Sequence, residues 1–136
     1  METEARLFEQ LDYVYTPSAD VAADVRYFTD VLGAELVFAI EDAGTRVAMV
    51  RLTKAPPALV LNDHVEGERP ILIFRVDRLG DAVEELSARG WAPERAVELP
   101  IGPARTFRSA GGQRIAIYES TRPEVVASFA GRRDFG

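Results

Sequence analysis

The sequence predicts an α+β fold built from two modules, each with the order strand, helix, strand, strand, strand. Two observations carry this prediction: the order of elements occurs twice, and equivalent positions keep a nearly constant offset. Gly33 and Gly90, which end the two expected helices, lie 57 residues apart, and Tyr13 and Ile71, in the two opening strands, lie 58 apart. Internal repetition indicates a duplicated unit. An α+β sandwich without duplication is the alternative that the pattern leaves open.

The first module is expected over about residues 10–63. Residues 11–17 alternate and contain tyrosine and valine, which favours a strand, and Pro17 ends it because proline cannot donate to a sheet ladder. Ser18 or Asp20 can cap the helix that follows. The apolar face of this helix comprises Val21, Val25, Phe28 and Leu32, and Gly33 ends it. Three further strands are expected over 34–40, 46–52 and 58–62.

The second module is expected over about residues 70–119, after a polar linker at 63–70. Residues 71–76 form its opening strand, and Asp77 is the candidate cap of its helix. The apolar helical face comprises Leu79, Ala82, Val83 and Leu86, and Gly90 ends the helix. Strands follow at 96–99, 104–108 and 113–118, with Gly111 and Gly112 turning the last pair.

The C-terminal tail, residues 120–136, is expected to contain a helical turn starting at Pro123. Phe129 and Phe135 are expected to dock on apolar surface. A frayed terminus is the alternative.

The composition fits one domain spanning residues 1–136, of which 47% are hydrophobic. No apolar run approaches the roughly 20 residues of a membrane span, and the acidic N-terminus is unlike a signal peptide. We therefore expect a cytoplasmic protein that does not bind membranes. The net charge of −6 argues against a nucleic-acid partner, because such proteins need a basic patch that neutralises phosphates.

The residue counts also restrict the chemistry. The chain has no cysteine, which excludes disulfides, thiolate nucleophiles and thiolate metal sites. One histidine, His64, cannot supply a three-histidine zinc site or a two-histidine iron site within one chain. Because His64 lies in the polar linker, a surface or turn role is preferred over catalysis.

Three segments resemble the vicinal oxygen chelate superfamily, which includes glyoxalases, bleomycin-resistance proteins and dioxygenases. Residues 27–33 (YFTDVLG), after the strand segment LDYV, are similar to the family's F-Y-x-x-V-L-G helix end. Residues 73–79 (IFRVDRL) are similar to its F-x-V-x-D-L pattern, and residues 107–115 (FRSAGGQRI) to its F-x-D-P-D-G-N-x-I turn with the acids lost. The resemblance covers about residues 10–119 and implies a curved mixed sheet around a cup, with helices on the outer face.

The resemblance also locates the positions where metal-dependent members bind their metal, on the first and last strands of each half. The equivalent residues here are Tyr13, Ala58 or Val60, Ile71 and Ala116. Alanine, valine and isoleucine have no donor atom, and a neutral tyrosine, with a pKa of about 10, is a poor ligand. The expectation is therefore a metal-free branch of the superfamily, with no metal and no cofactor.

Strand alternation then assigns side chains to the inside of the cup. The candidate ligand-binding residues are Tyr13, Tyr15, Asn62, Ile71, Ile73, Arg75, Phe107, Arg114, Ala116 and Tyr118. An apolar, aromatic cup with a few polar tips suits a flat or partly aromatic small molecule. For an anionic ligand, Arg75 or Arg114 is the expected counter-charge. In the alternative, the tyrosines only fill the cup and the arginines pair with nearby acids.

Three functions fit these expectations. The first is a metal-independent small-molecule binding protein of the bleomycin-resistance type, acting as a homodimer. The second is a metal-independent isomerase or lyase that uses tyrosine and arginine donors to stabilise an enolate; no catalytic residue is assigned, because no carboxylate is evident on the inner face. The third is a non-catalytic dimeric module, which a cup filled by its own side chains or by the tail would support.

Overall fold

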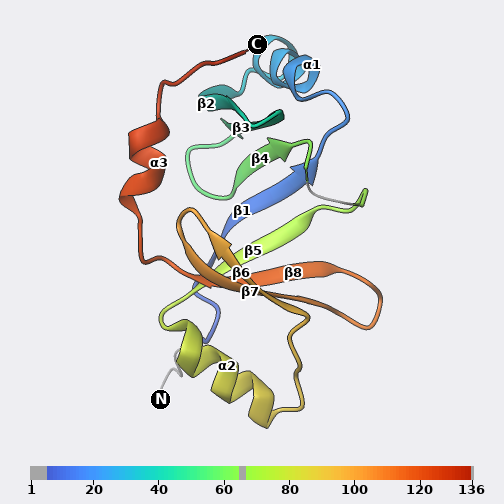
Figure 1. Ribbon diagram of the computed structural model, residues 1–136, viewed down its shortest axis with the longest axis vertical. Coiled ribbons are helices and arrows are strands. Elements are labelled where there is room, and N and C mark those ends of the chain that lie inside the picture. The colour runs from blue at the N-terminus through green and yellow to red at the C-terminus, as the bar shows by residue number, and fades with distance from the viewer. Residues whose placement is uncertain (1–5, 65–66, 136) are drawn as a thin grey trace.

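Within residues 6–64 and 67–135, which the computed structural model describes, eight strands form one curved mixed sheet in the order β2-β3-β4-β1-β5-β8-β7-β6 (Figure 1). Module one comprises β1 (Gln10–Pro17), α1 (Val21–Arg26), the π-helical turn η1 (Tyr27–Val31), β2 (Glu35–Asp42), β3 (Thr45–Arg51) and β4 (Ala58–Asn62). Module two comprises β5 (Ile71–Val76), α2 (Leu79–Ala88), β6 (Arg95–Leu99), β7 (Gly102–Arg108) and β8 (Arg114–Glu119). The tail adds α3 (Glu124–Phe129). The predicted α+β fold of two βαβββ modules is confirmed.

The two modules have the same internal pairing. In each, the opening strand runs parallel to the closing strand, β1 beside β4 and β5 beside β8. The modules join where β1 and β5 pair antiparallel, with Tyr13 opposite Ile73 and Tyr15 opposite Ile71. The inner faces of both modules therefore form one continuous concave surface. No helix in the described ranges is long and apolar enough to cross a membrane.

Helices α1 and α2 cover the outer face of the sheet, one over each module. Val21 and Val25 of α1 are buried against Ala39, Ala48 and Leu61. In α2, the buried residues Leu79, Ala82 and Leu86 pack on Val76 and Ile117. Each such aliphatic side chain contributes about 1.5–3 kcal/mol by leaving water, so these two clusters attach the helices to the outer face of the sheet.

The helix ends follow the predictions in part. The Asp20 carboxylate accepts a hydrogen bond from the Ala23 N–H (3.0 Å), which confirms Asp20 as the cap of α1. The prediction that Asp77 caps α2 is wrong. The first-turn N–H of Leu79 instead donates to Glu119 Oε1 (2.9 Å), so a carboxylate from the end of β8 stabilises this helix terminus.

The first helix differs from the regular α-helix that its periodicity predicts. Its second half is a π-helical turn, in which the Leu32 N–H donates to the Tyr27 carbonyl oxygen (3.1 Å) and Thr29 Oγ1 donates to the Val25 carbonyl oxygen (2.8 Å). The extra residue in this turn rotates the side chains that follow it about the helix axis. Leu32 is therefore 45% exposed, although the spacing assigned it to the buried face.

The tail crosses from the inner face to the outer face around the edge strand β2. Phe129 of α3 packs edge-to-face on Phe38 at a ring-centroid distance of 5.7 Å, and Phe135 joins the outer cluster beneath α1. Between these two phenylalanines the tail pairs with β2. The Ala39 N–H donates to the Arg132 carbonyl oxygen (2.8 Å), and the Asp134 N–H donates to the Ala39 carbonyl oxygen (2.7 Å). Docking of both phenylalanines is confirmed. The tail also covers the hydrogen-bonding groups that an edge strand leaves free.

The start of β7 lies close to the end of β8. A Cβ atom at Gly102 would lie 1.9 Å from the Glu119 carbonyl oxygen, so this approach requires glycine. The Arg122 N–H donates to the Ile101 carbonyl oxygen (3.0 Å). These contacts fix the point from which the tail leaves the sheet towards α3.

Candidate functional site

The inner face of the sheet has a defined row of side chains at its centre. The pairing places Ala58, Tyr13, Ile73 and Ala116 side by side on β4, β1, β5 and β8. Ile73, rather than Ile71, is thus the β5 residue directly between Tyr13 and Ala116. Ile71 lies in the neighbouring row, between Tyr15 and Arg114.

The residues of this central row do not fit a metal of the kind that the sequence resemblance implies. Aliphatic side chains provide no donor atom, and burial followed by the neighbouring Asp12 charge raises the pKa of Tyr13. Tyr13 is therefore neutral near pH 7, and its hydroxyl can act as a hydrogen-bond donor. Among the described residues, no group of three or more His, Cys, Asp or Glu side chains is arranged to hold a metal ion.

A buried carboxylate, Asp12, lies beside this row and was missed by the sequence reasoning. A β-bulge between Leu11 and Tyr13 interrupts the alternation of β1. Asp12, 7% exposed, accepts hydrogen bonds from Tyr118 Oη and Gln10 Nε2 (both 2.5 Å), and its Oδ2 lies 3.3 Å from Arg75 Nη1. A bulge adds one residue to a strand and redirects its side chain, and no turn or glycine signal in the sequence marks this one.

The concave face is divided between the modules. On module one, α3 covers the sheet and leaves a cavity of about 260 Å³. Its lining is mainly apolar and aromatic, with Tyr13, Tyr15, Phe38 and Met49 on the sheet side and Val126 and Phe129 on the helix side. The tail thus fills most of this half of the cup.

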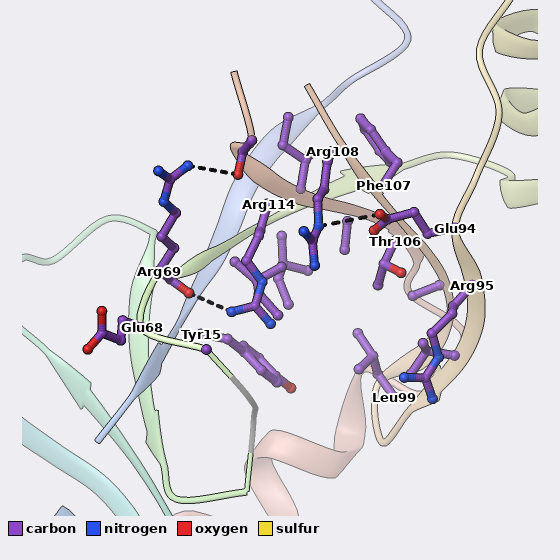
Figure 2. A pocket seen from close by; sticks show the side chains of 18 of the residues that line it. Tyr15, Glu68, Arg69, Glu94, Arg95, Leu99, Thr106, Phe107, Arg108 and Arg114 are labelled. Carbon is purple, nitrogen blue, oxygen red and sulfur yellow. Dashed lines mark hydrogen bonds and ion pairs between the residues drawn. The ribbon is translucent and has the colours of Figure 1, made fainter. Parts of the chain in front are cut away.

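On module two, the concave face carries a larger and open cavity of about 1160 Å³ (Figure 2). Its lining includes six aliphatic residues from β5, β6, β7 and β8: Ile71, Ile73, Val97, Leu99, Ala104 and Ala116. Tyr15 lines both cavities and so marks the boundary between them. Burial, reinforced by the nearby Tyr13, raises the pKa of Tyr15 to about 12, so its hydroxyl is a neutral donor.

The structure gathers six of the predicted ligand-binding residues at the large cavity: Tyr15, Ile71, Ile73, Phe107, Arg114 and Ala116. Tyr13 lines the small cavity instead. Asn62, Arg75 and Tyr118 line neither: Asn62 is fully buried, and the other two belong to the Asp12 network.

Phe107 requires a correction, because its ring was expected inside the cup. Thr106 lies opposite Ala116 and shares the inner face with it, whereas Phe107 pairs with Ile115 on the other face. The Phe107 ring packs edge-to-face against Trp91 at 5.4 Å, in the cluster beneath α2. The residue borders the cavity, but its ring belongs to the outer core.

Charged side chains surround the large cavity. Four arginines line it, Arg69, Arg95, Arg108 and Arg114, together with Glu68, Glu94 and His64. Of the arginines, the sequence reasoning identified only Arg114. The Gly111–Gly112 turn contained the missing signal, because a hairpin closed there sets Arg108 opposite Arg114 on one face.

Comparison with protein-family models and with curated proteins finds no match. Solved structures do match. A methylmalonyl-CoA epimerase from Mycobacterium tuberculosis has a TM-score of 0.74 at 20% identity, covering 90% of this chain and 95% of that chain. A hypothetical protein from Bacillus halodurans C-125 has a TM-score of 0.69 at 13% identity, covering 83% and 95%. A variant of the Streptomyces coelicolor methylmalonyl-CoA epimerase, in complex with 2-nitronate-propionyl-CoA, has a TM-score of 0.67 at 14% identity, covering 85% and 96%.

These likenesses establish the fold and nothing about the ligand. This chain shares the arrangement of elements seen in these epimerases over most of its length. The fold that the three sequence segments imply is thereby confirmed.

Proposed function

We propose that this protein binds a small apolar or aromatic molecule, without a metal, in the cavity of module two. The observation that carries the proposal is the open cavity of about 1160 Å³ with aliphatic side chains from four strands along its lining. Ligand sites in proteins are concave, mainly apolar and limited to a few polar groups that orient the ligand. Tyr15, Thr106 and the arginines supply such groups here.

Metal independence forms part of the proposal, and the central row of the sheet supports it. Three of its members, Ala58, Ile73 and Ala116, have no donor atom, and the fourth is a neutral tyrosine. Ligand binding is therefore expected to be the same before and after exhaustive dialysis against a chelator. A loss of binding that zinc, iron or manganese restores would contradict this part.

A thermal-shift screen with aromatic natural products tests the site. At one hundred times Kd a ligand stabilises the native state by about 2.7 kcal/mol, which raises the melting temperature of a domain of this size by roughly 5–10 °C. Thr106→Trp, in the middle of the lining, places an indole in the cavity and should abolish the shift. Glu84→Trp, on the exposed face of α2, is the matched control and should keep it. An equal shift in the Thr106→Trp variant would remove the cavity from consideration.

A metal-independent isomerase is the second candidate, favoured by a carboxylate at the cavity. Glu94 lines it and lies 3.3 Å from Arg108, measured from Oε2 to Nε. An enolate needs a base to form it and donors to stabilise it. Glu94 would be the base, and Tyr15 and Arg114, which line the same cavity, would be the donors. Methylmalonyl-CoA in deuterated water is the first substrate to try, since the similar structures are epimerases. Exchange that Glu94→Gln abolishes would support an enzyme, and absence of exchange in the natural protein would oppose this reaction.

The third candidate, a non-catalytic module whose cup is filled by the protein itself, finds support in module one only. There α3 fills the half-cup with Val126 and Phe129, as a self-filled module requires, whereas the module-two cavity stays open. A homodimer is also proposed, on the resemblance alone, and a cytoplasmic location is proposed from the composition. Sedimentation equilibrium tests the dimer, and a measured mass near 15 kDa, the mass of one chain, would contradict it.

A further inference from the structure

The module-two cavity contains a pair of like charges in direct register. Arg108 of β7 and Arg114 of β8 are cross-strand partners on the inner face, and both line the cavity. Side chains directly opposite each other in an antiparallel pair start about 4.5–5.5 Å apart at Cβ, and like charges there destabilise the sheet. A pair of arginines in this position therefore needs negative charge between or beside them.

Within the described residues, the protein supplies that negative charge to only one of the two. Glu94 pairs with Arg108 at 3.3 Å. Arg114 Nη1 donates to the Arg69 carbonyl oxygen at 2.8 Å, which fixes the guanidinium but leaves its charge unbalanced. The Arg95 side chain, on β6, makes no hydrogen bond or ion pair with any residue of the described ranges. Figure 2 shows the Arg114 guanidinium extending into the cavity.

Backbone carbonyl groups hold two of the four cavity arginines, Arg69 and Arg114, in place. Arg69 Nη1 donates to the carbonyl oxygens of Gly111 and Gly112 (3.3 and 3.1 Å) in the β7–β8 turn. The linker passes so close to Arg114 that a Cβ atom at Gly67 would lie 2.9 Å from its Nη1. A guanidinium fixed by such contacts presents its remaining N–H groups in one orientation, which suits a carboxylate, sulfonate or phosphate.

The local charge is opposite in sign to that of the whole chain. Four arginines and two glutamates line the cavity, whereas the net charge of the protein is −6. From these observations, and resting on the proposed function, we propose that the ligand carries an anionic group bound between Arg108 and Arg114. Its apolar part then lies along the β5 and β8 floor, where Ile71 is the direct neighbour of Arg114.

Two dyes that share an apolar body test this assignment. Anilinonaphthalene sulfonate carries one negative charge, and phenylnaphthylamine is its neutral counterpart. The natural protein should bind the sulfonate dye more tightly, and Arg114→Gln should weaken that binding about three- to tenfold while leaving the neutral dye unchanged. Glu94→Gln should act in the opposite direction and tighten binding of the sulfonate dye, because it frees Arg108. Arg89→Gln at the C-terminal end of α2, which removes an ion pair with Glu85, is the control and should change neither affinity.

The outcomes separate this inference from the proposed function. Equal affinity for both dyes, unchanged in Arg114→Gln and Glu94→Gln, would overturn the anion site while leaving an apolar site in place. Failure of the protein to bind either dye would overturn both. Circular dichroism and melting temperature confirm that each variant is folded, and Arg114→Lys, which keeps the charge without the fork, should lie between the natural protein and Arg114→Gln.

Discussion

Removal of the Asp12 carboxylate should destabilise the protein far more than removal of an exposed partner of the same arginine. In the Asp12→Ala variant, the Tyr118 hydroxyl, on a side chain 2% exposed, loses its acceptor. An orphaned buried donor and a lost charge-assisted hydrogen bond together amount to about 3 kcal/mol. Glu9 pairs with the same Arg75 but is 41% exposed, so Glu9→Ala should change stability by less than about 1 kcal/mol.

A double-mutant cycle makes the claim quantitative. Tyr118→Phe removes the hydroxyl while Asp12 keeps Gln10 and Arg75, which should cost about 1.5 kcal/mol. With the hydroxyl gone, Asp12→Ala no longer creates an orphan, so the double variant should lose about 3 kcal/mol rather than an additive ~4.5 kcal/mol. Urea unfolding followed by circular dichroism gives the free energies of unfolding. Additive losses within about 0.5 kcal/mol would refute the buried network.

Three further perturbations follow from the structure. In the folded protein the pKa of Tyr15 is raised to about 12. The contribution of neutral Tyr15 to the free energy of unfolding is therefore complete below pH ~10 and is lost between about pH 10 and 12, by up to ~2.7 kcal/mol. Tyr15→Phe should reduce this alkaline loss of stability in unfolding experiments. Phe129→Ala should destabilise by about 1–2 kcal/mol by removing a half-buried ring from Phe38, and should increase proteolysis of the tail. Gly102→Ala should cost more than about 3 kcal/mol because of the clash at 1.9 Å, whereas Gly111→Ala, with no atom within 4 Å, should be nearly neutral.

Much of the fold was predictable because its signals are local or repeated. The helix cap at Asp20, the glycines at 33 and 90 with φ of 76° and 90°, and the constant offset of the two modules all act through short-range geometry. Docking of Phe129 and Phe135 followed from their hydrophobicity. Hydrophobicity did not predict that the two rings lie on opposite faces of the sheet, because the path of the tail around β2 depends on its hydrogen bonds to Ala39.

The site was predicted less completely because strand alternation fails wherever a residue is added or the register shifts. The bulge at Asp12 brings a carboxylate to the inner face that strict alternation excludes. One residue of register decides whether Phe107 or Thr106 lines the cup. The π-helical turn acts on the helix in the same way and exposes Leu32. Arg114 was identified because its strand is regular between Arg114 and Glu119.

Chemical-shift mapping by NMR tests the central claim most directly. We expect a bound anionic aromatic molecule, such as anilinonaphthalene sulfonate, to shift the amide resonances of Ile71, Thr106, Arg114 and Ala116, around the module-two cavity. The same shifts should occur with a chelator present, and the α3 resonances at 124–129 should stay unchanged. Shifts confined to α3 and module one, or shifts that disappear when the chelator is added, would contradict a metal-independent ligand site in module two.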